Sequence, residues 1–371
     1  MVPLDSGRPF PTCHRRRGPR PPRERNPSAL DPFYLISTRW DRCRLPSARA
    51  RRRRIRRPLE YVSCCLCGQV ASCTYARVRD RLHGHPGEFT FVRCRGCGHV
   101  YLSPRPTHEE LAAHYPETYA AYAGAIEDEP NPFVRWNRAY GMAKRCRAVT
   151  RRVPRGRLLD VGCGTGVFLD AMRRRGWDVR GVEPTAAAAR IARERFDLDV
   201  LVGTLEEAAY PSGHFDAVTL WYVIEHVPNP SATIAEIARV LRPGGLALMS
   251  APNVDALDRP LFGACWAGWD PPRHLNIFSA RSLGRLLERH GFAAVRAQSL
   301  MNTWLGLALG LQFRWEQWRG IDPTPEYRRR HKWDVMLPMQ ALRLLALPYT
   351  WLADRLGAGT MIVVSATRGG L

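Results

Sequence analysis

The segment Leu158–Gly166, which reads LLDVGCGTG, constrains the fold more than any other part of the chain. An apolar run leads into three glycines within five residues, and a helical pattern follows. Glycines let the backbone adopt positive φ and pass close to a ligand. A helix that begins behind them offers free N–H groups and the positive end of its dipole. The segment therefore predicts a strand, a tight turn and a helix, with the turn suited to a carboxylate or a phosphate.

The pattern on both sides of this turn alternates between short apolar runs and helical segments. Apolar strands that alternate with helices are typical of a parallel, doubly wound sheet. We therefore expect an α/β fold, entered through a helix over 131–152. Its strands are expected at 158–161, 178–182, 200–202, 217–221, 246–250, 293–298 and 361–365.

The spacing of the glycines and an acidic residue further on indicate the kind of ligand. In a dinucleotide fingerprint the third glycine would fall where this chain has Val167, which argues against NAD. Glu183 ends the second expected strand, 19 residues after Gly164, where a carboxylate can bond both hydroxyls of an adenosine ribose. The alternative is a glycine turn that is only structural; Glu183 and the strand pattern argue against it.

Four motifs in order then resemble the class I S-adenosylmethionine-dependent methyltransferases. They are 158–166, 181–184 (GVEP), 215–227 (FDAVTLWYVIEHV) and 241–245 (LRPGG). The resemblance implies a Rossmann-like sheet of seven strands, the last antiparallel and inserted near the edge. It implies that Asp160, Gly162, Cys163, Gly164 and Gly166 hold the methionine end of the cofactor, Glu183 the ribose, and Thr204, Leu205 and Glu206 the adenine side, with Trp221 beside the methionine.

Two histidines are candidates for a catalytic base, because a base is useful when the methyl acceptor is a hydroxyl or a carbon acid. His226 follows the fourth expected strand at the rim where ligands bind in open α/β sheets. Its alternative role is to brace the loop. His274 lies in WDPPRHLN (269–276), which resembles a motif of bacterial relatives with an Arg-His pair near the acceptor site.

Two C-x-x-C pairs precede the expected sheet. Cys64 and Cys67 form one pair, Cys94 and Cys97 the other, and each is followed by glycine. Four thiolates prefer tetrahedral zinc, and a closed site of this kind has no open position for substrate. We predict a structural zinc, with a module that folds without metal as the alternative.

The order of these motifs resembles a broad bacterial group linked to the modification of sugars, polysaccharides or secondary metabolites. We therefore expect O- or C-methylation of a small-molecule, glycan or lipid-linked acceptor. The alternatives are a zinc methyltransferase that binds RNA or another nucleic acid, and a non-catalytic scaffold with the same fold. The expected domains are a tail at 1–57, a zinc-ribbon-like module at 58–108 and a methyltransferase domain at 109–371.

The net charge of +22 does not by itself indicate nucleic-acid binding. Residues 1–57 carry 17 arginines against four acidic residues, together with many prolines and serines, so much of the charge lies in an expected disordered tail. A start codon assigned too far upstream explains this tail equally well. The absence of a secretory h-region and the metal-like cysteine spacing favour the cytoplasm.

Residues 300–359 form a long insertion, rich in Trp, Leu and Met, between the last two expected strands. Its apolar runs are too short or too interrupted by proline and arginine to span a bilayer. We expect helices there that either cover the substrate side or make peripheral contact with a membrane surface.

Overall fold

The computed structural model describes residues 59–115, 124–299, 303–321, 324, 326–327 and 345–370. The expected tail at 1–57 lies outside these residues, as does part of the expected insertion at 300–359. Among the helices described, none is both long and apolar enough to cross a membrane.

A seven-stranded sheet forms the centre of the chain, in the order β12-β13-β10-β9-β6-β7-β8. β13 pairs antiparallel with both β10 and β12, whereas β6, β7, β8, β9 and β10 run parallel. The expected class of fold is therefore confirmed, including the antiparallel last strand next to the edge. The bounds are β6 Arg157–Val161, β7 Asp178–Glu183, β8 Val200–Val202, β9 Phe215–Trp221, β10 Leu241–Pro252, β12 Phe292–Gln298 and β13 Met361–Arg368.

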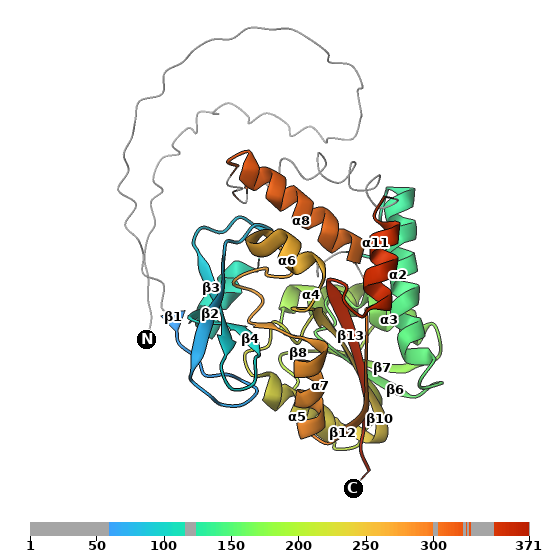
Figure 1. Ribbon diagram of the computed structural model, residues 1–371. Helices are drawn as coiled ribbons and strands as arrows, with labels where there is room; N and C mark the ends of the chain where they lie inside the picture. The colour runs from blue at the N-terminus through green and yellow to red at the C-terminus, as the bar shows by residue number, and fades with distance from the viewer. Residues whose placement is uncertain are drawn as a thin grey trace, which may run out of the picture. The chain divides into compact units, whose positions relative to one another are not determined.

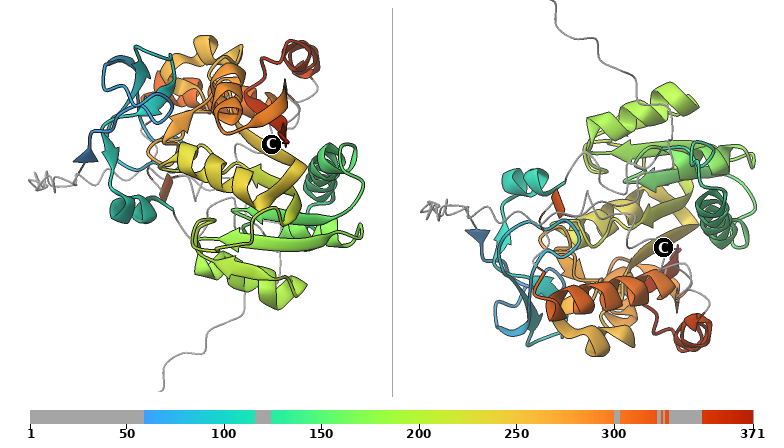
Figure 2. Two further views of the ribbon diagram at one scale, coloured as in Figure 1. Left: turned by 90° about the horizontal axis from the view of Figure 1, so that it is seen from below. Right: turned by 90° about the horizontal axis from the view of Figure 1, so that it is seen from above.

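Helices lie on both faces of this sheet (Figure 2), as expected because a parallel sheet is apolar on both sides. The entry helix is capped by Asn131, whose side chain accepts hydrogen bonds from the N–H groups of Phe133 and Val134. The helices are α2 Pro132–Thr150, α3 Val167–Arg173, α4 Ala186–Phe196, α5 Pro230–Val240, α6 Asp258–Phe262 and α7 Ala280–Arg289, with the short turn η3 Gly263–Cys265.

The cysteine-rich part forms its own sheet, in the order β11-β4-β3-β2, drawn largely in blue in Figure 1. Its fourth strand, β11 (Asn276–Ile277), comes from the methyltransferase part of the sequence and pairs antiparallel with β4. The remaining elements of this part are β1 Leu59–Glu60, β2 Ser72–Val78, β3 Phe89–Cys94, β4 Val100–Leu102, β5 Arg105–Pro106, α1 His108–Leu111 and η1 Ala112–His114.

The described residues of the segment 300–359 include two helices. α8 (Thr303–Trp318) packs on α6 and contacts α11 (Leu347–Arg355). α8 is the long orange helix of Figure 1. Gly310 allows this packing, because a Cβ there would lie 2.4 Å from the ring of Phe262.

Candidate active site

The glycine turn after β6 has the backbone that the sequence predicts. Gly162 has φ of 68° and donates its N–H to the carbonyl of Val182 at 2.7 Å, which ties the turn to β7. A Cβ at Gly162 would lie 2.5 Å from Cγ2 of Val223. Gly166, with φ of 80°, lets α3 begin close to α4, because a Cβ there would lie 2.9 Å from that of Ala192. Only glycine fits either position without strain.

Glu183 joins the two loops expected to surround the cofactor. It ends β7 and is buried, and its carboxylate accepts hydrogen bonds from the N–H of Gly164 at 2.8 Å and of Thr185 at 2.9 Å. A carboxylate has about four lone-pair sites, so both oxygens retain capacity for ribose hydroxyls.

Asp160 and Trp221 lie on neighbouring strands at the same end of the sheet. Burial raises the pKa of Asp160 to about 7, against the hydrogen bond that it accepts from Oγ1 of Thr219 at 2.6 Å. Trp221 packs edge-on against Phe168, with ring centroids 5.5 Å apart. Its indole N–H is buried and has no hydrogen-bond partner among the described residues. Such an orphaned donor beside the glycine turn fits a polar ligand group there.

Arg145 is a residue that the sequence analysis missed. It projects from α2, and its guanidinium lies 5.4 Å from the ring centre of Trp221 and 5.2 Å from that of Tyr222. It therefore brings a positive charge to the end of the sheet at which β9 ends. No sequence signal distinguishes it, because α2 carries several other arginines at similar spacing.

The expected adenine-side residues lie in the turn after β8, which pairs with the strand that ends in Glu183. Leu205 is buried in the core, whereas Thr204 and Glu206 are exposed. Glu206 accepts a hydrogen bond from Oγ1 of Thr233 on α5 at 2.9 Å. Cys163, inside the glycine turn, is buried.

His226 and His274 lie together, with ring centroids 4.8 Å apart. Nδ1 of His226 is 3.0 Å from the carbonyl of Arg273 and 3.0 Å from the hydroxyl of Tyr115, and Nδ1 of His274 is 2.9 Å from the carbonyl of Gly268. A carbonyl only accepts, so each Nδ1 carries the hydrogen and each Nε2 keeps its lone pair. Burial, together with the charge of the neighbouring His274, lowers the pKa of His226 to about 3. Burial also lowers the pKa of His274.

Glu225 completes this group and was also missed, although it precedes His226 directly. Its side chain is fully buried, and neither carboxylate oxygen has a hydrogen-bond partner among the described residues. Burial raises its pKa to about 8. One donor atom from each of Glu225, His226 and His274 can be chosen so that all lie within 4.8 Å of one another.

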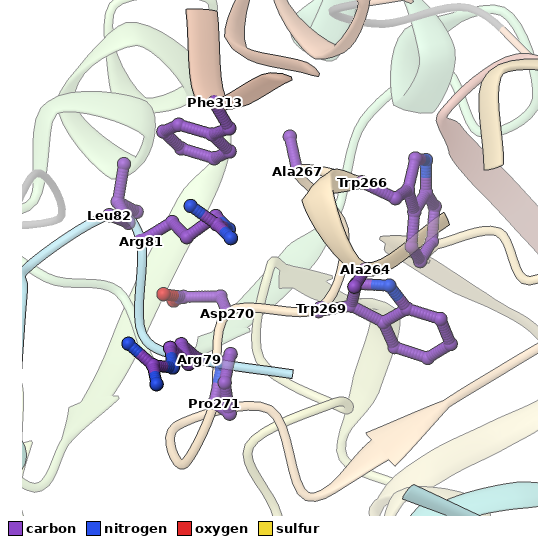
Figure 3. A pocket seen from close by; sticks show the side chains of 10 residues that line it. All are labelled: Arg79, Arg81, Leu82, Ala264, Trp266, Ala267, Trp269, Asp270, Pro271 and Phe313. Carbon is purple, nitrogen blue, oxygen red and sulfur yellow. The ribbon is translucent and has the colours of Figure 1, made fainter. Parts of the chain in front are cut away.

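A small hollow lies beside Asp270, with room for about one water molecule. Figure 3 shows Asp270 in its wall, with the carboxylate on the side of Arg79 and Arg81 and pointing away from the rings of Trp266 and Trp269. Oδ2 of Asp270 is 3.8 Å from Nε2 of His274. Arg79 and Arg81, from the loop between β2 and β3, also line the hollow.

The four predicted cysteine ligands come together next to the β11-β4-β3-β2 sheet, in the turn before β2 and the turn between β3 and β4. Sγ of Cys64 is 3.4 Å from that of Cys97, Sγ of Cys67 is 3.4 Å from that of Cys94, and all four lie within 4.8 Å of one another. Zinc bonded to four sulfurs at about 2.3 Å needs sulfurs about 3.8 Å apart. The four thiols therefore fit a tetrahedral zinc. Cys73 is exposed and lies outside the cluster.

Comparisons with known proteins agree with this geometry. Residues 133–297 match the family model described as a methyltransferase domain. A ubiquinone biosynthesis O-methyltransferase of Alkalilimnicola ehrlichii is 40% identical over 103 residues, which cover 26% of this chain and 42% of the relative. One from Thiobacillus denitrificans is 36% identical over 121 residues, 30% of this chain and 52% of the relative. The chain thus spans about half the length of these curated relatives.

Solved structures with similar folds have low identity. A geranyl diphosphate C-methyltransferase from Streptomyces coelicolor has a TM-score of 0.45 and 15% identity, and covers 70% of this chain and 97% of that one. A methyltransferase of Thermotoga maritima, described as a possible histamine N-methyltransferase, has a TM-score of 0.42 and 20% identity, and covers 64% and 94%.

Residues 133–297 thus carry a methyltransferase domain, and its strand order, glycine turn and acidic end of β7 are those implied by the resemblance to class I S-adenosylmethionine-dependent methyltransferases. This chain carries that domain, and the module with the four cysteines precedes it.

Proposed function

We propose that the chain transfers a methyl group from S-adenosylmethionine to a hydroxyl, or to an acidic carbon, of a small-molecule, glycan or lipid-linked acceptor. The observation that carries this proposal is the presence of two sites at one end of the sheet. The first is the glycine turn joined to Glu183, and the second is the buried group of Glu225, His226 and His274.

The residues on the cofactor side fit the parts of S-adenosylmethionine separately. Glu183 has capacity for the ribose hydroxyls, and Arg145 carries the charge that the methionine carboxylate requires. Trp221 and Asp160 supply a buried N–H and a buried carboxyl beside the same end. Thr204, Leu205 and Glu206 are assigned to the adenine side, and Gly162, Cys163, Gly164 and Gly166 to the turn that admits the methionine.

When bound, S-adenosylmethionine supplies a methyl group on a positively charged sulfur, so the protein has mainly to align the acceptor and remove its proton. We propose that Nε2 of His274 accepts the proton that the acceptor loses. The Nδ1–H of His274 is held by Gly268, which orients the ring, and the lowered pKa keeps Nε2 unprotonated at neutral pH. His226 fixes the neighbouring side of the site through Tyr115 and Arg273.

The experiment that tests the activity begins with the cofactor. We expect full-length protein to bind S-adenosylmethionine and S-adenosylhomocysteine with micromolar dissociation constants by calorimetry. Transfer of labelled methyl groups to panels of polyprenylated phenols, glycans and hydroxylated metabolites then identifies the acceptor. Well-folded, zinc-loaded protein that binds neither compound would contradict the proposal and favour the scaffold alternative.

A lipid-linked acceptor is favoured by the exposed faces of α8 and α11. Leu311, Trp315 and Trp318 recur at helical spacing on α8, and Trp351 and Leu352 are exposed on α11. The exposed charged residues described on these helices and the turn after α8 are Arg314, Arg319 and Arg355. Tryptophan, leucine and arginine on one face are typical of a helix that lies on an anionic membrane surface.

Vesicle binding tests this assignment. We expect the protein to sediment with vesicles rich in phosphatidylglycerol more than with phosphatidylcholine vesicles, and expect Trp315→Ser with Trp351→Ser to abolish the difference. Trp136→Ser on α2 is the matched control, because Trp136 is exposed to a similar degree. Equal binding by the double variant and the control variant would contradict it.

A further inference from the structure

The strand that completes the cysteine-rich sheet also holds Glu225 in place. In β11, Asn276 pairs with Tyr101 and Ile277 with Val100 of β4. The N–H groups of Leu275 and Asn276 both donate to the carbonyl of Glu225, at 2.8 and 3.0 Å, and the carbonyl of Leu275 accepts from Leu102 at 2.9 Å. The backbone at 275–276 is therefore bonded to the module on one side and to Glu225 on the other.

The side chain of Asn276 makes a second connection from the cysteine turns to the same segment. Its Oδ1 lies 3.2 Å from Sγ of Cys65 and 3.1 Å from Nε2 of His99, and its Nδ2 donates to the carbonyl of Val227 at 3.0 Å. Cys65 follows the first cysteine of one pair, and His99 lies two residues after the other pair. Each of the two turns that would hold zinc is thus connected through Asn276 to Val227, the residue after His226.

Arg273 makes a third connection. Its side chain is fully buried and donates to both oxygens of Asp80, at 3.0 and 2.8 Å, where Asp80 belongs to the loop after β2. Its Nε donates to Asp270 at 3.1 Å, and its carbonyl faces Nδ1 of His226. A buried, bidentate pair of this kind fixes the position of both partners. Removing Asp80 would leave buried guanidinium N–H groups without their acceptor, while Asp270 would still balance the charge of Arg273.

The cofactor turn is held by other elements. The hydrogen bonds of Asp160, Gly162 and Gly164 described above go to Thr219, Val182 and Glu183, all strand residues of the seven-stranded sheet. A disturbance of the module is therefore transmitted to the acceptor side by direct bonds, whereas the cofactor side has its own supports.

We propose that the four-cysteine module is a positioning element of the acceptor site, which acts through β11, Asn276 and the Asp80–Arg273 pair on Glu225, His226 and His274. This inference rests on the proposed function for the role of those three residues. Asp80, Arg273 and Asn276 are positioning residues, and the metal that the cysteines fit would set the acceptor geometry without contacting the acceptor.

Hydrogen exchange and histidine NMR of the full-length, zinc-loaded protein test this coupling. In Asp80→Asn we expect exchange at 222–228 and 273–278 to accelerate at least about tenfold, with the imidazole signals of His226 and His274 shifted. We expect the dissociation constant of S-adenosylhomocysteine to change less than about twofold, well under the tenfold step of 1.4 kcal/mol. Asp170→Asn on α3 is the matched control, because Asp170 is buried like Asp80 and forms ion pairs with arginines of its own helix and helix end.

A second comparison covers the case in which Asp80→Asn does not fold. Asp80→Glu keeps the charge, and chelator-treated protein is compared with the same sample reloaded with zinc. We expect both to disturb the same two segments, and zinc to restore them. Unchanged exchange and unchanged histidine signals in these samples would overturn the coupling, as would an equal effect of Asp170→Asn. Failure to bind S-adenosylhomocysteine in the wild type would instead count against the proposed function, since the exchange readout does not depend on it.

Discussion

The carboxylate of Glu183 accepts a hydrogen bond from the backbone N–H of Gly164 at 2.8 Å, so the end of one strand is bonded to the glycine turn that follows its neighbour. The other carboxylate oxygen of Glu183 accepts a hydrogen bond from the backbone N–H of Thr185 at 2.9 Å. The residue that we assign to the ribose therefore also shapes the turn that we assign to the methionine.

Loss of this carboxylate should weaken cofactor binding strongly. Hydrogen bonds to a charged group contribute about 1.5–3 kcal/mol, so we expect Glu183→Ala to raise the dissociation constant of S-adenosylmethionine about tenfold to a hundredfold by calorimetry. Glu194→Ala, on the exposed side of α4, is the control and should bind normally. Equal affinity in the two variants would count against the assignment.

Gly162→Ala should abolish cofactor binding, because the turn has no room for a side chain at this position. The new Cβ would meet Val223 at 2.5 Å and would force a non-glycine residue to φ of 68°. Adding Val223→Ala removes the clash but not the backbone strain, so we expect the double variant to recover affinity only in part. Full recovery would show that the clash alone matters, and binding by the single variant would refute the geometry.

Arg145→Ala separates recognition of the carboxylate from recognition of the nucleoside. We expect S-adenosylhomocysteine to bind about tenfold or more weakly, as for loss of a charged hydrogen bond, whereas methylthioadenosine, which lacks the amino acid, should bind unchanged. Arg152→Ala, exposed just after α2, is the control. A parallel loss for both ligands would place Arg145 in a structural role.

Glu225→Gln should change how stability depends on pH. Burial raises the pKa of Glu225 to about 8 in the folded protein, from the 4.5 of a solvated glutamic acid. The contribution of the neutral carboxyl to the free energy of unfolding is fully present below about pH 4.5. It is lost as the pH rises through about 8, because the unfolded chain releases the proton at a lower pH than the folded protein does. We therefore expect the variant to gain up to a few kcal/mol relative to wild type between pH 5 and pH 8. Denaturant unfolding at both pH values measures this, and an unchanged difference would mean that the carboxyl is not buried as described.

The cysteine cluster should bind one zinc ion per chain, measurable by native mass spectrometry. We expect Cys94→Ser to lose most of this zinc, because it removes one of four thiolate ligands. Cys73→Ser, outside the cluster, should retain it. Zinc retained by the first variant, or lost by both, would contradict the ligand set.

The sequence by itself determined the class of fold and the local structure of the residues that we propose for the cofactor. All seven strands of the sheet were predicted within a few residues, apart from the longer β10, because buried parallel strands are short apolar runs separated by helices. The glycine turn and Glu183 follow from local backbone chemistry, which sequence records directly. The two cysteine pairs were recognisable for the same reason, since each metal turn is a local structure.

Only the tertiary structure decided which distant residues meet around His226 and His274, where we propose the acceptor site. β2 was not predicted, and nothing in the sequence indicates that β11 would join its sheet, because strand partners are chosen by packing. Arg145, Glu225 and Asp80 resemble many other charged residues in the chain, and the sequence singled out Arg273 only as the neighbour of His274. Their roles depend on burial and on distant partners, such as Asp80 and Arg273, which are 193 positions apart. Desolvation and pairing are properties of the folded environment, so the sequence alone does not reveal them.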